Sequence, residues 1–132
     1  MKQIVPLLVV LLISCAPTHF LSNAEIPTAK KLKDIMWAQA ELADPAFKKI
    51  NTTTYTDADW EVFTTTGKRL QLTSAKIKHD FSKGADWDAM ASHLANGATD
   101  LIAAAEAKDG KATTAALEAT RNSCRICHKR FR

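Results

Sequence analysis

The sequence predicts an all-α protein, an antiparallel up-down-up-down four-helix bundle. Three observations support this fold class. Four successive stretches place apolar residues at the spacing of one helix face, most connections between them are short, and no stretch alternates convincingly as a strand would. We expect residues 25–132 to form this one domain, because their number is common for a single hydrophobic core.

The first helix is expected over Thr28–Ala43. Pro27 stands just before its start, where the missing N–H costs little. Asp44-Pro45 is expected to end or kink the helix, since the residue before a proline avoids the helical region. The helix face is marked by residues three or four apart: Leu32, Ile35, Met36, Gln39 and Leu42.

The second helix has the clearest period and is expected from Thr56 or Asp57 to Phe81. Thr56 or Asp57 can cap its start, and Ser82-Lys83-Gly84 ends it. Small residues in its stripe predict a close approach to a neighbouring helix or to a cofactor edge. The stripe comprises Trp60, Phe63, Gly67, Leu70, Ser74, Ile77 and Phe81. The threonine-rich run before this helix is expected to be a loop.

The third helix is expected to begin near Asp86 and to stop at Lys108-Asp109-Gly110, with glycine in the usual place after a helix. The fourth is expected from about Thr113 to the end of the sequence. Its small or apolar positions include Ala116, Leu117 and Ile126.

A leader is expected over residues 1–24. Lys2 precedes an apolar run from Ile4 to Ile13, which is too short to span a bilayer and is typical of an export signal. The protein is therefore expected in the periplasm or otherwise outside the cytoplasm of a bacterium.

The sequence offers two alternative cleavage sites for removal of the leader. The segment Leu12-Ile13-Ser14-Cys15 resembles a bacterial lipobox, in which Cys15 becomes a lipidated N-terminus and tethers the protein to a membrane. Ser22-Asn23-Ala24 instead offers small residues for ordinary cleavage before Glu25.

Charge and cysteine content narrow the function classes. The net charge of +4 is small and dispersed, so no nucleic-acid partner is expected. Of three cysteines, one lies in the leader and two lie close together near the end, so no structural disulfide is expected.

Cys124, Cys127 and His128 form the pattern C-x-x-C-H. This pattern is typical of covalent attachment of one haem c, because two thiols on one helical turn can reach both vinyl groups. His128 can then bind the iron as the proximal ligand. A zinc site would need further ligands, and a thioredoxin-like pair would follow a strand; the sequence supports neither.

With C-x-x-C-H on the last of four helices, followed by Phe131-Arg132, the sequence resembles the class II cytochromes c, the cytochrome c′ family and its low-spin relatives. That family is itself a standard example of the four-helix bundle. The resemblance implies thioether bonds at Cys124 and Cys127, iron ligation by His128, and a distal haem face covered by the first helix. In low-spin members a methionine on that helix ligates the iron, and Met36 matches its position.

The resemblance implies an electron carrier rather than an enzyme, with His128 and Met36 as iron ligands and redox proteins of unknown identity as partners; a homodimer is also compatible with it. The alternative is a five-coordinate cytochrome c′ that binds small gases such as nitric oxide, with an open distal site near Ile35. His93 is a less favoured distal ligand.

Relatives often carry an arginine on the first helix close to the haem propionates, and this sequence lacks it. Lys30, Lys31 and Lys33 stand there instead, and the cations near the end of the sequence, Lys129, Arg130 and Arg132, are alternative partners.

Overall fold

The computed structural model describes residues 20–132, so the apolar leader run and Cys15 lie outside the described residues. A short 3-10 helix, η1, precedes four α-helices, and the described residues contain no strand. The elements are η1 (Ile26–Thr28), α1 (Leu32–Phe47), α2 (Asp57–Asp80), α3 (Ala85–Glu106) and α4 (Gly110–Phe131). The predicted all-α four-helix bundle is confirmed.

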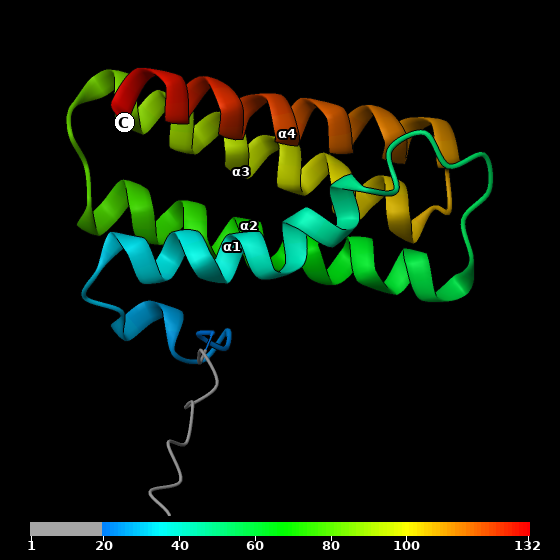
Figure 1. Ribbon diagram of the computed structural model, residues 1–132, viewed down its shortest axis with the longest axis horizontal. Helices are drawn as coiled ribbons and strands as arrows, with labels where there is room; N and C mark the ends of the chain where they lie inside the picture. The colour runs from blue at the N-terminus through cyan, green and yellow to red at the C-terminus, as the bar shows by residue number, and fades with distance from the viewer. Residues whose placement is uncertain (1–19) are drawn as a thin grey trace, which may run out of the picture.

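The four helices run side by side and reverse direction at each connection (Figure 1). Helices α2 and α3 pack along most of their lengths, α3 packs against α4, and α1 packs against α2. The contact that closes the ring, between α1 and α4, is much the smallest of the four. This sparse seam is where the two helices with the predicted iron ligands face each other.

The start of α2 confirms the predicted cap. The Thr56 side chain accepts a hydrogen bond from the backbone N–H of Asp59, and the Asp59 carboxylate accepts one from the backbone N–H of Thr56, which makes a complete capping box. Lys49 lies 3.0 Å from the same carboxylate. The backbone hydrogen bond from Thr56 and the Lys49 ammonium hold the pKa of Asp59 below its ordinary value.

Asp44-Pro45 was expected to end or kink the first helix, and the helix does not end there, because α1 continues to Phe47. Proline removes one hydrogen bond, that to the carbonyl of Glu41, and Glu41 lies on the exposed side of the helix, where water can replace the donor. The next carbonyl, that of Leu42, accepts a hydrogen bond from the Thr66 hydroxyl of α2 at 3.2 Å. Packing against α2 thus supports the helix past the proline.

The helix starts also differ from the prediction at two places. Pro27 supports the separate turn η1, and extended backbone at Ala29 and Lys31 delays α1 to Leu32. Gly110 does not end α3; it is the first residue of α4, whose cap is the Asp109 side chain bonded to the N–H of Ala112. Lys108, with φ of 51°, takes the left-handed conformation that the sequence suggested for glycine.

Gly67 confirms the predicted close approach between helices. A Cβ atom at this position would lie 3.0 Å from the carbonyl oxygen of Ala98 and closer still to Ile102, both on α3. The small residue therefore serves helix packing rather than a cofactor edge.

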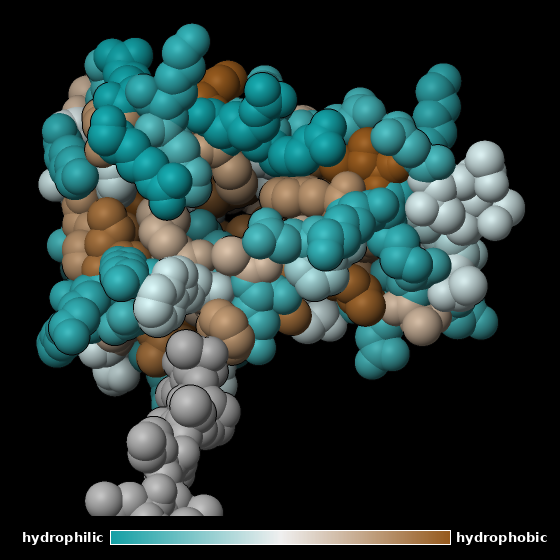
Figure 2. All heavy atoms as spheres, viewed as in Figure 1, coloured by the Kyte–Doolittle hydropathy of each residue, from teal (hydrophilic) through white to brown (hydrophobic). Residues whose placement is uncertain are grey.

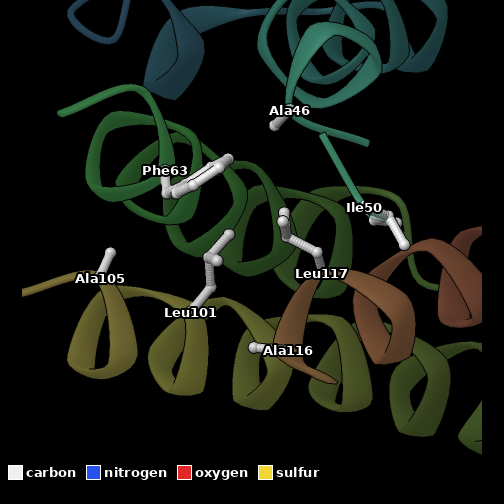
Figure 3. Packing of buried hydrophobic residues seen from close by; sticks show 7 residues of the cluster. All are labelled: Ala46, Ile50, Phe63, Leu101, Ala105, Ala116 and Leu117. Carbon is white, nitrogen blue, oxygen red and sulfur yellow. The ribbon is translucent and has the colours of Figure 1, made fainter. Parts of the chain in front are cut away.

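The bundle contains two main hydrophobic clusters, one near each end. The first joins the end of α1, the start of α2, the end of α3 and the start of α4 (Figure 3). Its buried members are Ala46, Ile50, Phe63, Leu101, Ala105, Ala116 and Leu117. We call this the closed end. The second cluster contains Ile26, Ile35, Ala38, Ile77, Trp87 and Ala91 at the opposite end, beside the last turns of α4.

Candidate haem site

The three residues of the C-x-x-C-H pattern lie in the last turns of α4, which is helical without interruption to Phe131. Cys124, Cys127 and His128 are all partly buried. Spacings of three and four residues put the first thiol on the same helix face as the second thiol and the imidazole.

Two adjoining cavities open beside this face. Both are bordered by Met36, Trp87, Cys127 and His128, so the cavities are two parts of one hollow. The first is further lined by Gln39, Ile77, Met90, Ala91, Leu94, Ser123 and Cys124, and the second by Leu32, Lys83, Phe131 and Arg132. In the space-filling view, hydrophobic side chains are visible between hydrophilic ones at this end of the molecule (Figure 2).

The two thiols are held in their neutral form. Burial raises the pKa of Cys124 to about 11, with smaller contributions from Cys127 and Asp44, and burial also raises the pKa of Cys127. Cysteine pairs of the thioredoxin type show the opposite shift, toward the thiolate. Among residues 20–132, no group of three or more His, Cys, Asp or Glu side chains could hold a metal ion together.

The imidazole of His128 is held in its neutral form as well. Burial lowers its pKa, and the neighbouring Arg132 lowers it further. An unprotonated ring nitrogen is the form that ligates iron.

Two methionines border the hollow. Met36 on α1 borders both cavities, as does His128 on α4, whereas Met90 on α3 borders only the first. The structure therefore brings all four predicted site residues, Cys124, Cys127, His128 and Met36, to one place.

Comparison with known proteins decides the family. The family model described as cytochrome C′ matches residues 26–132, which is most of the chain.

The chain belongs to the cytochrome c′ family.

Searches of the curated proteins and of the solved structures gave no match. Proteins of the cytochrome c′ family carry a covalently attached haem c and are exported. Within residues 20–132, no helix combines the length and the apolar character that crossing a membrane requires.

The residues present fit the haem of a cytochrome c′. Two neutral thiols and a neutral imidazole stand on one helix face, and a mainly apolar hollow lies directly beside them. This donor set can supply two thioether bonds and one axial nitrogen, and the apolar walls can bury the porphyrin faces.

The cations that border the hollow lie on different elements from the lysines of the first helix that were expected to pair with the haem propionates. Lys33 on α1 stacks over the exposed ring of Trp37, with its Nζ 4.5 Å from the ring centroid. Arg130 is paired with Asp86. The cations that border the second cavity are Lys83 and Arg132. Of these two, only Arg132 was expected from the sequence.

The position of Lys83 near the hollow could have been inferred indirectly from the sequence. It lies in the connection between α2 and α3, and in an antiparallel bundle that connection falls at the same end as the last turns of α4. Its Nζ lies 4.6 Å from the centroid of the Trp87 ring, at the mouth of the second cavity.

Gln39 is a second residue that the sequence analysis did not assign to the site. It is 7% exposed, borders the first cavity and donates a hydrogen bond from Nε2 to the Thr73 hydroxyl at 2.9 Å. The available signal was a polar residue on the apolar face of the first helix, three residues after Met36.

Other candidates lie away from the hollow. Trp60 and Phe63 belong to the closed end, whereas Trp87 borders both cavities. Ile35 is fully buried in the second cluster and borders neither cavity. His93 is exposed and also borders neither.

Proposed function

We propose that this c-type cytochrome is an exported carrier of single electrons, with His128 and Met36 as the two axial iron ligands. The proposal rests on one observation. Met36 and His128 lie on neighbouring helices and border the same two cavities. When bound, haem supplies an Fe(III)/Fe(II) couple, and a thioether opposite an imidazole raises its potential.

The side chains around the hollow suit this role. His128 offers a neutral nitrogen, and Met36 has an unbranched side chain whose sulfur can adjust to the position of the iron. Trp87, Ile77 and Leu94 contribute apolar walls, which exclude water and stabilise the less charged state of the iron centre. No substrate-transforming chemistry is required of the protein.

A second function is favoured by the composition of the same walls. Apart from the methionines and Gln39, the residues that α1, α2 and α3 contribute to the first cavity are apolar: Ile77, Trp87, Ala91 and Leu94. If Met36 did not ligate, such walls would leave one iron position open to a small gas such as nitric oxide, as in five-coordinate members of the family.

Absorption spectra of the ferric and ferrous holoprotein separate the two functions. We expect low-spin spectra in both states, with the long-wavelength band of methionine-ligated ferric haem, and no change on adding carbon monoxide. Met36→Leu should convert the haem to high spin and allow carbon monoxide to bind. Met90→Leu is the matched control, because it removes the other methionine of the hollow and should leave the spectra unchanged.

Each other result has a defined meaning. A wild-type protein that is high-spin and binds carbon monoxide would favour the gas-binding function. Conversion to high spin by Met90→Leu instead of Met36→Leu would move the distal ligand from α1 to α3.

A further inference from the structure

Arg69 is a buried cation in the middle of α2. It is 8% exposed, and its guanidinium donates to four acceptors, all outside α2. Within the bundle, its guanidinium donates to the carbonyl of Ala38 at 3.1 Å and to the carboxylate of Glu41 at 3.3 Å, both on α1.

The other two partners of Arg69 precede η1. Nη1 donates to the backbone carbonyl of Leu21 at 2.9 Å, and Nε donates to the side-chain oxygen of Asn23. Both acceptors lie before Ala24, in the segment that ordinary leader cleavage would remove, and outside the family match, which begins at Ile26.

The same segment makes further contacts with the fold. The Leu21 side chain packs against the second hydrophobic cluster. The carboxylate of Glu25 accepts hydrogen bonds from the backbone N–H and the hydroxyl of Ser22, at 2.8 Å and 2.7 Å, and the N–H of Ile26 bonds to the Ser22 carbonyl. Ile26 itself is fully buried. Residues 21–24 are therefore bonded to both α2 and η1.

Cleavage after Ala24 would leave Arg69 with two of its four acceptors. A guanidinium has five N–H donors, and those that now donate to Leu21 and Asn23 would have to be satisfied by water in the space that residues 21–24 leave. Removing Leu21 would also expose apolar surface of the second cluster.

We propose that residues 21–24, which we call the N-terminal strap, are retained in the mature protein, and that the leader is cut upstream of Leu21. Of the two cleavage sites that the sequence offers, only the one before Cys15 keeps the strap. Hydrolysis of the Ser14–Cys15 peptide bond would release the leader. The ordinary site after Ala24 would remain uncut.

The first test is the intact mass of the holoprotein, purified from both membrane and soluble fractions of a host that exports it and attaches haem. We expect an N-terminus at Cys15. A mature N-terminus anywhere after Leu21, including Glu25, would overturn the proposal.

The second test uses Asn23→Ala in the full precursor. If the strap is retained, the mature holoprotein carries the substitution and its denaturation midpoint falls. If cleavage follows Ala24, the mature protein is identical to wild type in mass and midpoint. Because Asn23 and Arg69 share one hydrogen bond, the midpoint should fall less in Asn23→Ala with Arg69→Gln than the sum of the two single shifts.

Lys76→Gln provides the matched control. Lys76 also lies on α2 and donates to the carbonyl of Pro27 at 2.6 Å, a partner that both cleavage sites retain. Its effect should therefore add to that of Asn23→Ala without coupling. An unchanged midpoint in Asn23→Ala, or equal coupling with Lys76→Gln and Arg69→Gln, would overturn the structural role of the strap.

Discussion

At the closed end of the bundle aromatic rings fill the core, whereas at the opposite end the core gives way to the hollow beside the C-x-x-C-H residues. Tyr55 packs edge-on against Trp60 and Phe63, with ring centroids 5.1 Å and 4.9 Å away, and its hydroxyl lies 2.7 Å from that of Thr114. At the haem end the corresponding pair, Trp87 and Phe131, stands at the cavity edge. One end is completed by protein atoms and the other by the cofactor, so their stabilities should respond differently to haem.

The largest effect is expected from the double variant Cys124→Ala with Cys127→Ala. Covalent haem should be lost completely, and the haem end should loosen because its hollow loses the group that fills it. A haem stain after denaturing electrophoresis measures attachment. Hydrogen exchange should rise around Trp87 more than around Leu101, which is fully buried at the closed end.

Ser123→Ala is the control for the thiol variant, since Ser123 also borders the first cavity. It should keep covalent haem and the wild-type exchange pattern. Equal loosening of both ends in the cysteine variant would contradict the division of the bundle into two differently stabilised ends.

A smaller effect is expected from Phe63→Ala at the closed end. Phe63 is fully buried, and truncation of such a ring costs about 3–5 kcal/mol of unfolding free energy. Because Phe63 lies in the other cluster, the haem spectrum should not change. Chemical denaturation and absorption spectra measure the two quantities.

Phe131→Ala sharpens the contrast with Phe63→Ala. Phe131 is only partly buried and borders the second cavity, so its loss should cost less stability and should alter the spectrum. If the two variants changed the spectrum alike, the separation of the two ends would be wrong.

The smallest effect is expected at the cap of α2. Thr56→Ala removes the side-chain acceptor of the capping box and should cost about 1 kcal/mol at neutral pH. The lowered pKa of Asp59 means that the fold favours its carboxylate. Its contribution is therefore present above the ordinary pKa of 3.8 and is lost as the pH falls through the lowered value.

Denaturation midpoints measured between pH 2 and pH 7 test this cap. Asp59→Asn should flatten the acid side of the profile. Thr56→Ala should weaken the pH dependence only in part, because it removes the hydrogen bond from the Thr56 hydroxyl to the Asp59 carboxylate but keeps the backbone hydrogen bond, which lowers that pKa most. An unaltered acid profile in Asp59→Asn would exclude Asp59 as the titrating group.

The helices, the cap of α2 and the C-x-x-C-H residues could be predicted from the sequence because each rests on neighbours a few residues apart. The course of α1 past Pro45 could not, since it depends on the Thr66 hydroxyl of another helix. The roles of Gln39 and Lys83 were missed for a similar reason. Both residues reach the hollow only through the packing of distant segments, which no local period records.

The place where the N-terminal segment joins the bundle determines which helices would face a membrane if the chain is tethered there. Helix η1 packs on α2, and α2 lies diagonal to α4, whose neighbours are α1 and α3 (Figure 1). If the mature chain begins with a lipidated Cys15, six Cα–Cα steps link that residue to Leu21, a reach of about 20 Å at full extension. The α2 side would then lie toward the lipid headgroups. Helix α4, with its exposed cations Arg121, Arg125 and Lys129, would then face the aqueous space.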